Sequence, residues 1–368
     1  MKYLNEGPAA FLSGKHYDIV WSTTEKGVAW VEVNGKNYYD NSSGILRSEE
    51  KIHKVTVPQS ELDAAKEYTI CFRRVLNRKP YFPEAEDIVQ TKKFKFFPVL
   101  KGKDLKVYVL GDCHDFRDAV MKVGKYYGDD LDMLVLNGDV SENRFYDELI
   151  TATVLSQSIT KGEKPTLYVR GNHDLRGELA SEMLCYAGTD NEKFYFTFTA
   201  GDIFGIVLDG GEDKPDTSKE YGNLAAFSAY RSEQIDFLDK IIAEKQYEGY
   251  DKVLVFCHIP LNTKRNELMP ETYIEWAKRL NVIKPDVMVC AHEHYAEFVP
   301  AGYNLFGEVV LEFPMHIGSV LEAEWIDDVC HLLDFAGTAM EVGKDKITLK
   351  IAGEDFVDRE VYTVDLQK

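Results

Sequence analysis

The chain has 368 residues, 45% of them hydrophobic, and carries 43 basic against 62 acidic side chains, which gives a formal net charge of −19. This composition supports a buried core and excludes intrinsic disorder. The acidic balance disfavours binding to extended nucleic acid, and no apolar run reaches the roughly 20 residues of a membrane span. Because the first twenty residues lack the basic and apolar parts of a signal peptide, we expect a cytoplasmic protein, or a secreted one if a leader has been removed.

Residues 1–98 are predicted to form a β-sandwich of antiparallel strands. Short runs rich in β-branched and aromatic residues recur between turn signals such as Asn34-Gly35, and no helical period is present. The spacing of Leu62 and Tyr68 resembles the tyrosine corner of fibronectin type III domains. We interpret His53 as a surface residue of this sandwich and residues 98–106 as the linker to the next domain.

From residue 105 to residue 368 the pattern changes to that of an α/β domain. Six apolar runs end in polar residues and alternate with amphipathic stretches, which predicts buried strands connected by helices. The runs cover residues 106–112, 132–139, 166–174, 203–211, 252–258 and 286–292. Residues 347–353 and 359–366 alternate in the manner of antiparallel strands that close the sheet on one side.

Five of the nine histidines lie at these strand ends, together with acidic and amide side chains. The candidate metal ligands are Asp112, His114, Asp139, Asn172, His258, His292 and His294, and His173 follows Asn172 directly. Loops at the carboxyl ends of strands converge in open α/β sheets, and such oxygen and imidazole groups bind Zn, Mn, Fe or Mg. Taken singly, a turn aspartate, an Asx turn or a lone histidine has an ordinary structural role. The ordered set favours a metal site, because unpaired buried polar groups are costly.

The order D-x-H, G-D, G-N-H-D, H and A-H-x-H resembles that of the calcineurin-like metallophosphoesterase superfamily, over about Leu105 to Pro300, with Ala291 where that family usually has glycine. This resemblance implies an αββα sandwich that holds two metal ions. One ion would be held by Asp112, His114, Asp139 and His294, and the other by Asp139, Asn172, His258 and His292. The resemblance thus makes Asp139 the bridging ligand.

The same resemblance implies hydrolysis of phosphate esters by a hydroxide that bridges two divalent ions of Mn, Fe, Zn or Mg. His173 would protonate the leaving group and would be oriented by Asp174. The N-terminal sandwich resembles the arrangement in purple acid phosphatases. Those enzymes carry an iron-binding tyrosine three residues after the bridging aspartate, where this chain has Glu142. We therefore expect a colourless enzyme with two divalent metals, or an iron site that lacks the charge-transfer band.

Substrate contacts are predicted at Asn143, Arg144 and Tyr295, which lie close to the metal motifs, with solvated or capping side chains as the alternative. We expect a small-molecule phosphate ester as substrate, either a monoester or a diester, and a homodimer is compatible with the sequence. The alternative function is a catalytically silent scaffold of this fold that acts in protein association. The presence of His173 favours an enzyme, and the acidic surface disfavours a nuclease.

Overall fold

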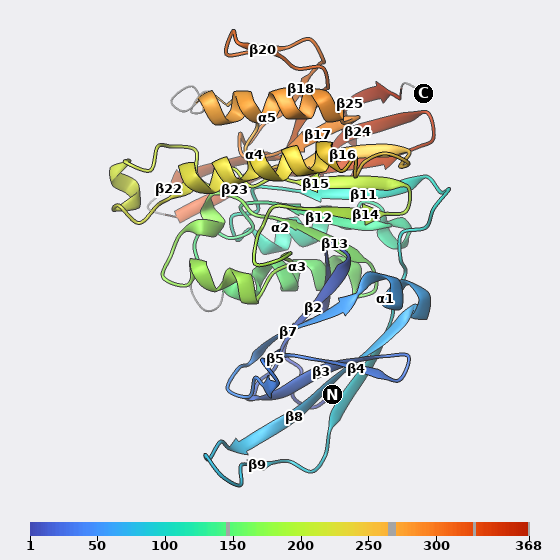
Figure 1. The fold of residues 1–368 in the computed structure, drawn as a ribbon, viewed down its shortest axis with the longest axis vertical. Helices are drawn as coiled ribbons and strands as arrows, with labels where there is room; N and C mark the ends of the chain where they lie inside the picture. Colours follow the sequence, from blue (N-terminus) through green and yellow to red (C-terminus); the bar gives the residue numbers. More distant parts are fainter. Residues whose placement is uncertain (145–147, 264–269, 327–328, 367–368) are drawn as a thin grey trace.

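Two β-sheets packed face to face, with helices on both outer sides, form the larger part of the molecule (Figure 1). The computed structural model describes residues 1–144, 148–263, 270–326 and 329–366. The resulting order of layers is helix, sheet, sheet, helix, which confirms the predicted αββα sandwich. The N-terminal region lies at one end of this sandwich, in blue at the lower end of the view.

The first sheet has ten strands and joins the two predicted domains. Its strands, in spatial order, are β25 (Asp358–Asp365), β24 (Lys346–Gly353), β23 (Val329–Val342), β11 (Leu105–Leu110), β12 (Met133–Asn137), β13 (Pro165–Val169), β1 (Ala9–Ser13), β2 (His16–Ser22) and β7 (Ile52–Pro58), with β22 (Val320–Ile326) paired to β23. Strands β11, β12, β13 and β1 run parallel, and β23, β24 and β25 close one side in antiparallel order. The predicted antiparallel closure is therefore present.

The second sheet has six strands and supplies the other half of the sandwich. Its order is β14 (Phe196–Ala200), β15 (Ile203–Val207), β16 (Lys252–Phe256), β17 (Val287–Cys290), β21 (Met315–Gly318) and β18 (Ala296–Val299). Of the strands that carry the predicted motifs, β12, β13, β15, β16 and β17 are buried along their whole length, and β11 is buried except at Lys106. Buried strands read as continuous apolar runs, which is why the sequence located them correctly.

Helices cover the outer faces because their apolar sides complete two further clusters of buried residues. Helices α2 (Arg117–Val123) and α3 (Thr151–Thr160) pack on the first sheet, and α4 (Phe227–Ala243) and α5 (Pro270–Ile283) pack on the second. Short 3-10 helices lie in the connections: η1 (Gly128–Asp130), η2 (Glu148–Ile150), η3 (His173–Leu175), η4 (Ala180–Cys185) and η5 (Lys219–Tyr221). Within the described part of the chain, no helix is both long enough and apolar enough to cross a bilayer.

The N-terminal region also forms a sheet of its own, which is antiparallel as predicted. Its strands are β10 (Gln90–Lys95), β8 (Glu67–Asn77), β3 (Gly27–Val33) and β4 (Lys36–Tyr39), with β9 (Glu84–Ala85) paired to β8. Two short hairpins are formed by β5 (Asn41–Ser42) with β6 (Ile45–Leu46), and by β19 (Asn304–Leu305) with β20 (Val309–Val310). One helix was not expected here, α1 (Gln59–Ala65), whose seven residues bury only Leu62 and are too few to show a helical period.

The N-terminal region is built into the sandwich rather than attached by the linker alone. Phe11 of β1 is the register partner of Thr166 of β13, so one sheet runs through both regions. The buried Tyr68 hydroxyl donates a hydrogen bond to the carbonyl oxygen of Gly162, 2.7 Å away. Tyr68 thus ties the N-terminal sheet to the connection between α3 and β13. His53, expected at the surface, is fully buried and lies between the rings of Trp21 and Phe72.

Candidate metal centre

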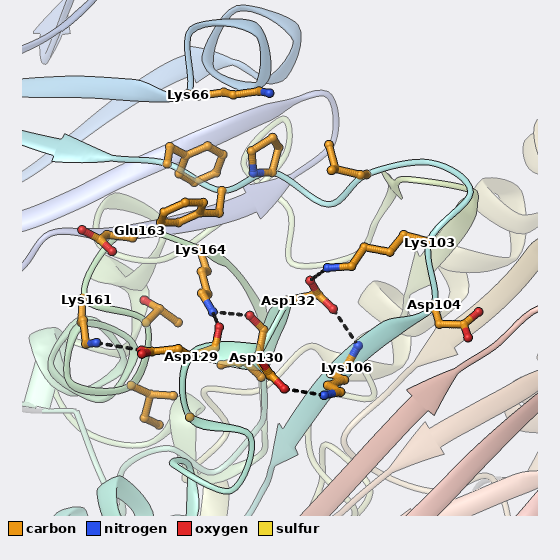
Figure 2. A pocket seen from close by; sticks show the side chains of 18 residues that line it. Lys66, Lys103, Asp104, Lys106, Asp129, Asp130, Asp132, Lys161, Glu163 and Lys164 are labelled. Carbon is orange, nitrogen blue, oxygen red and sulfur yellow. Dashed lines mark hydrogen bonds and ion pairs between the residues drawn. The ribbon is translucent and has the colours of Figure 1, made fainter.

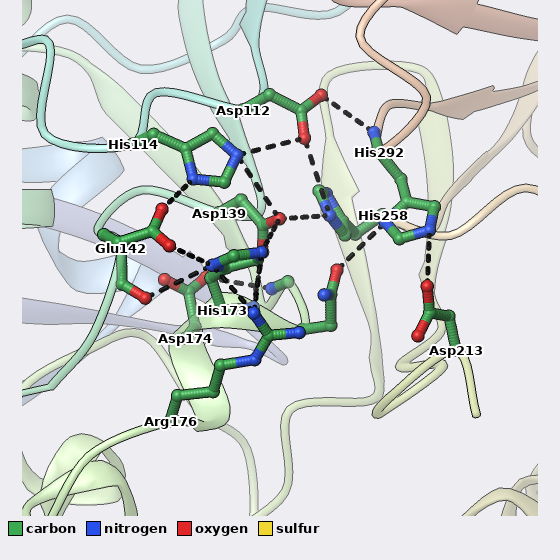
Figure 3. Close-up of polar contacts among 12 residues, drawn as sticks. Asp112, His114, Asp139, Glu142, His173, Asp174, Arg176, Asp213, His258 and His292 are labelled. Atoms are coloured by element: carbon green, nitrogen blue, oxygen red, sulfur yellow. Dashed lines mark hydrogen bonds and ion pairs between the residues drawn. The ribbon is translucent and has the colours of Figure 1, made fainter. Parts of the chain in front are cut away.

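The loops that follow five strands bring the predicted ligands together at one end of the sandwich (Figure 3). The first sheet contributes the residues after β11, β12 and β13, and the second sheet contributes those after β16 and β17. The carboxyl ends of these parallel strands therefore meet, as the sequence predicts. Both sheets are needed for the site, because His258 and His292 come from the second sheet and Asp112 and Asp139 from the first.

The backbone of the site is held in an unusual conformation. Five candidate ligands have positive φ angles: Asp112 (52°), His114 (39°), Asp139 (49°), His292 (74°) and His294 (58°). Residues other than glycine rarely adopt this left-handed region, and such strain is concentrated at functional sites. The neighbouring glycines permit close approach, since a Cβ on Gly138 would lie 2.3 Å from Nδ1 of His258 and one on Gly171 would lie 2.2 Å from the backbone nitrogen of Asp139.

The ligands form two groups that Asp139 connects. In the first group, Oδ1 of Asp112 lies 3.5 Å from Nε2 of His294 and 3.9 Å from Nε2 of His114. In the second, Oδ2 of Asp139 lies 3.2 Å from Nε2 of His258, and the same oxygen lies 3.7 Å from Nε2 of His114 in the first group.

The two remaining predicted ligands, His292 and Asn172, complete the second group. His292 belongs to it together with Asp139 and His258, because ligand atoms of these three residues lie within 4.8 Å of one another. Oδ1 of Asn172 lies 2.9 Å from Nδ1 of His292. All seven predicted metal ligands therefore lie at this one place in the fold.

The residues fit divalent cations, because two buried polar atoms point into the cluster and have no hydrogen-bond partner among the described residues. These atoms are Oδ1 of Asp112 and Nε2 of His258. The other oxygen of Asp112 accepts hydrogen bonds from the backbone N–H of His292 and from the hydroxyl of Ser319. Nδ1 of His258 donates to the carbonyl oxygen of Asn137 at 2.7 Å. Such contacts fix the ring and leave Nε2 as the ligand atom, as in other histidine metal sites.

Interactions between charged groups inside the cluster change the pKa values of its residues more than burial does. Burial alone would raise the pKa of Asp112, but the nearby His294 imidazole and the charge of His258 lower it to about 2. Burial likewise opposes ionisation of Asp139, yet His258 holds its pKa below the usual value. Burial lowers the pKa of His258, but the charge of Asp139 raises it to about 9. The carboxylates therefore keep their negative charge and favour cations beside them.

Glu142 forms a third group with two histidines. Its Oε2 accepts from Nδ1 of His114 at 2.7 Å, and its Oε1 lies 3.1 Å from Nδ1 of His173. The hydrogen bonds from His114 and His173 lower the pKa of Glu142, and burial opposes them only in part. Nε2 of His173 faces the cluster, 4.0 Å from Oδ2 of Asp139. One carboxylate thus orients both a candidate ligand and the candidate general acid.

Two predicted residues lie in other surroundings than the sequence suggested. Arg144, expected at the substrate, is fully buried and pairs with Asp174. Asp174 also accepts hydrogen bonds from the backbone N–H groups of Val140 and Gly171, so it holds the two loops together. The residue that contacts the His173 ring, as was expected of Asp174, is Glu142. The physical reason is that the Arg144 charge needs a buried partner, and Asp174 supplies it.

The remaining predicted contacts lie at the edge of the cluster. Tyr295 is 47% exposed and, with Asp139, His173 and Arg176, lines an open cavity of about 880 Å³ above the ligands. Asn143 is half-buried next to Glu142.

Sequence reasoning missed Arg176, Asp213 and Ser319. Oδ2 of Asp213 lies 3.4 Å from Nε2 of His292, and Arg176 lies against His173. Asp213 lies in the loop after β15, further from its strand than the predicted ligands are from theirs. Ser319 directly follows β21, so it also lies at a strand end, whereas Arg176 lies after η3 and follows no strand directly.

A second cavity, of about 780 Å³, lies between the N-terminal region and the loop that contains η1 (Figure 2). Several of its charged side chains pair with one another, as Lys103 does with Asp132 and Lys106 with Asp130. Lys164 donates to the backbone carbonyl oxygens of the same loop. Among the residues that the structure describes, no group of potential metal ligands lies at this cavity, so the first cavity is the candidate active site.

Comparisons with known proteins agree with this geometry. The structure of a purple acid phosphatase from yellow lupin (Lupinus luteus) seeds matches with a TM-score of 0.62 at 13% identity, over 98% of this chain and 75% of that one. The structure of PhoD matches with a TM-score of 0.53 at 10% identity, over 100% of this chain and 92% of that one. No curated protein sequence matches the chain. Residues 105–296, more than half of the chain, match the sequence model of one family, and the chain therefore belongs to the calcineurin-like phosphoesterase family.

Proposed function

We propose that this protein is a dinuclear metal-dependent phosphoesterase that hydrolyses small phosphate esters, with His173 as the general acid. The observation that carries the proposal is the position of Asp139, whose Oδ2 lies within 4 Å of imidazole nitrogens from both ligand groups. A carboxylate in this position suits two cations that share one ligand. Asp112, His114 and His294 would hold one ion, and Asn172, His258 and His292 the other.

When bound, the two cations supply positive charge for the phosphoryl oxygens and lower the pKa of water, which makes an effective nucleophile at neutral pH. The protein fixes this chemistry through its own contacts. Ser319 and the backbone of His292 hold Asp112, and Asn137 holds His258. Such supporting contacts set ligand orientation and strengthen metal binding.

His173 is placed to protonate the leaving oxygen. Its Nε2 faces the cluster and its Nδ1 faces Glu142, so the carboxylate favours the tautomer with a proton on Nδ1 and stabilises the ring when Nε2 is also protonated. The pKa of His173 is raised, because the hydrogen bond to Glu142 overcomes the lowering effect of burial. A positioned general acid contributes about 100- to 10,000-fold to such a rate.

The cavity and the surface charge support a small substrate. The opening above the ligands is about 880 Å³, within the range of small-molecule sites. The net charge of −19 disfavours a polymer of phosphates over the surface as a whole.

The test is metal reconstitution. Chelated protein is loaded with Mn, Zn, Fe or Mg and assayed with p-nitrophenyl phosphate and its bis-ester. We expect turnover with at least one metal, and a loss of about 100-fold or more in kcat for His173→Gln with full metal content. His331→Gln, at an exposed histidine outside the site, is the control. No turnover with any metal would refute the proposal, and loss of metal from His173→Gln would refute the role of His173.

A further inference from the structure

Arg176 lies in the candidate active site and belongs to none of the metal groups (Figure 3). We infer that Arg176 binds a non-bridging oxygen of the substrate's phosphoryl group and thereby selects phosphomonoesters over diesters. This inference rests on the proposed phosphoesterase function and assigns its substrate class.

The guanidinium of Arg176 is fixed along one edge. Its Nε lies 3.0 Å from Oε1 of Glu212 and its Nη2 lies 3.2 Å from Oε2. Glu212 is itself 2% exposed, and the hydroxyl of Tyr221 donates to its Oε2 at 3.1 Å. A two-point contact with a buried carboxylate leaves the planar group little freedom to rotate. The other edge of Arg176 is therefore held toward the cavity.

Within the described part of the chain, the terminal nitrogen on that edge contacts the His173 ring and no carboxylate. Nη1 lies 2.9 Å from Nε2 and 3.1 Å from Nδ1 of His173. Nδ1 faces the carboxylate of Glu142, so it donates there and has no lone pair for Arg176. A general acid must also donate from Nε2. An anionic oxygen that lies in the cavity beside both groups would accept a hydrogen bond from each.

The position relative to the metal groups indicates which oxygen this is. Nε2 of His173 lies 4.0 Å from Asp139 on one side and 2.9 Å from Arg176 on the other. A phosphoryl group that contacts the metal groups with two of its oxygens can thus present the third to Arg176. Lys214 also lines the cavity, but its ammonium is paired with Glu220.

The third oxygen separates the two substrate classes. In a monoester the transferred group has three non-bridging oxygens, all of which carry negative charge in the transition state. In a diester the third position is an ester oxygen with a carbon substituent, which accepts hydrogen bonds weakly and would place carbon against the guanidinium. Because the charged hydrogen bond from Arg176 is made with a monoester and lost with a diester, the site should strongly favour monoesters.

The experiment compares Arg176→Ala and Arg176→Lys with Arg73→Ala, which removes an exposed arginine far from the site along the chain. Each metal-loaded protein is assayed with p-nitrophenyl phosphate and with its bis-ester, and binding of inorganic phosphate is measured by calorimetry. For Arg176→Ala we expect kcat/KM to fall about 10- to 100-fold with the monoester and less than about 3-fold with the diester. Phosphate binding should weaken about 10-fold or more, with metal content unchanged. Arg176→Lys should recover only part of the loss, because an ammonium is a point charge without the guanidinium's fork.

Equal losses with both esters, or unchanged phosphate binding in Arg176→Ala, would overturn the inference. Should Arg176→Ala fail to fold, as judged by circular dichroism, the same comparison in Arg176→Lys decides. A wild-type protein that hydrolyses neither ester would refute the proposed function instead. The phosphate titration remains a separate test of the arginine in that case.

Discussion

The carboxylate of Glu142 lies against His173, with Oε1 3.1 Å from Nδ1 of the ring. Its other oxygen accepts from Nδ1 of His114 at 2.7 Å, so a single side chain orients a candidate metal ligand and the proposed general acid. In the sequence, Glu142 is notable only as the residue in place of an iron-binding tyrosine. The structure gives this position a role of its own.

Glu142→Gln should lower kcat about 10- to 100-fold, the usual effect of losing a supporting contact at a metal site. An amide has one acceptor oxygen where the carboxylate has two, so only one histidine keeps its partner. Steady-state kinetics with p-nitrophenyl phosphate measure the change. The matched control is Glu178→Gln, an exposed glutamate in the loop after His173. Equal kcat values for Glu142→Gln and the control would contradict the role of Glu142.

Arg144→Met should destabilise the fold by about 3 to 5 kcal/mol, because it leaves the buried carboxylate of Asp174 without its charged partner. The double variant Arg144→Met with Asp174→Asn should be more stable than the sum of the single changes predicts. Urea unfolding of the four proteins measures this coupling. Purely additive free energies would show that the two side chains do not depend on each other.

Tyr68→Phe tests the connection between the N-terminal region and the sandwich. The substitution leaves the Gly162 carbonyl oxygen buried without its donor, which should cost about 1 to 3 kcal/mol. Tyr81→Phe is the control, since Tyr81 is 81% exposed. A shift in urea midpoint is expected for Tyr68→Phe alone. The same midpoint in both variants would mean that this hydrogen bond does not stabilise the fold.

His316 should make stability depend on pH. Burial lowers its pKa to about 3, below the ordinary value of 6.5, so the folded protein keeps the ring neutral while the unfolded chain takes up a proton below about pH 6.5. The stability from this residue is complete above that pH and is lost as the pH falls toward 3. At about pH 4.5 the loss should be about 2 to 3 kcal/mol relative to pH 7.

His316→Gln is the variant that checks this, since the amide keeps a polar group beside Thr338. Unfolding free energies of the metal-free proteins at both pH values should show a smaller loss for His316→Gln than for the parent. Equal losses in the two proteins would show that His316 does not carry the effect.

The strands and the candidate metal ligands could be predicted because both follow from local patterns in the sequence. An apolar run that ends in a polar residue, such as β11 before Asp112 or β16 before His258, gives the strand and the ligand at once. The calcineurin-like order of motifs then paired the ligands, and the geometry brings all seven to one place. The positions of the strands and of the polar residues at their ends can be recognised from each segment alone, without knowledge of its contacts in the fold.

Contacts between distant loops could not be predicted in this way. Arg144 is buried because Asp174, thirty residues later, lies beside it, and Arg176 is oriented by Glu212. Neither pair follows a period or a motif spacing. His53 is buried because β7 pairs with β2 and packs under Phe72 of β8, which depends on the assembled sheets. Helix α1 was missed because its seven residues bury one side chain.

The central claim is that Asp139 joins two metal ions, and the metal content of Asp139→Asn tests it most directly. After chelation, reloading and gel filtration, elemental analysis should find two ions per chain in the parent protein. The asparagine variant should hold fewer than one while its circular dichroism spectrum stays unchanged, since a neutral amide is a poor bridge between two cations. A folded Asp139→Asn protein that retains two ions, or a parent that binds none, would contradict the account.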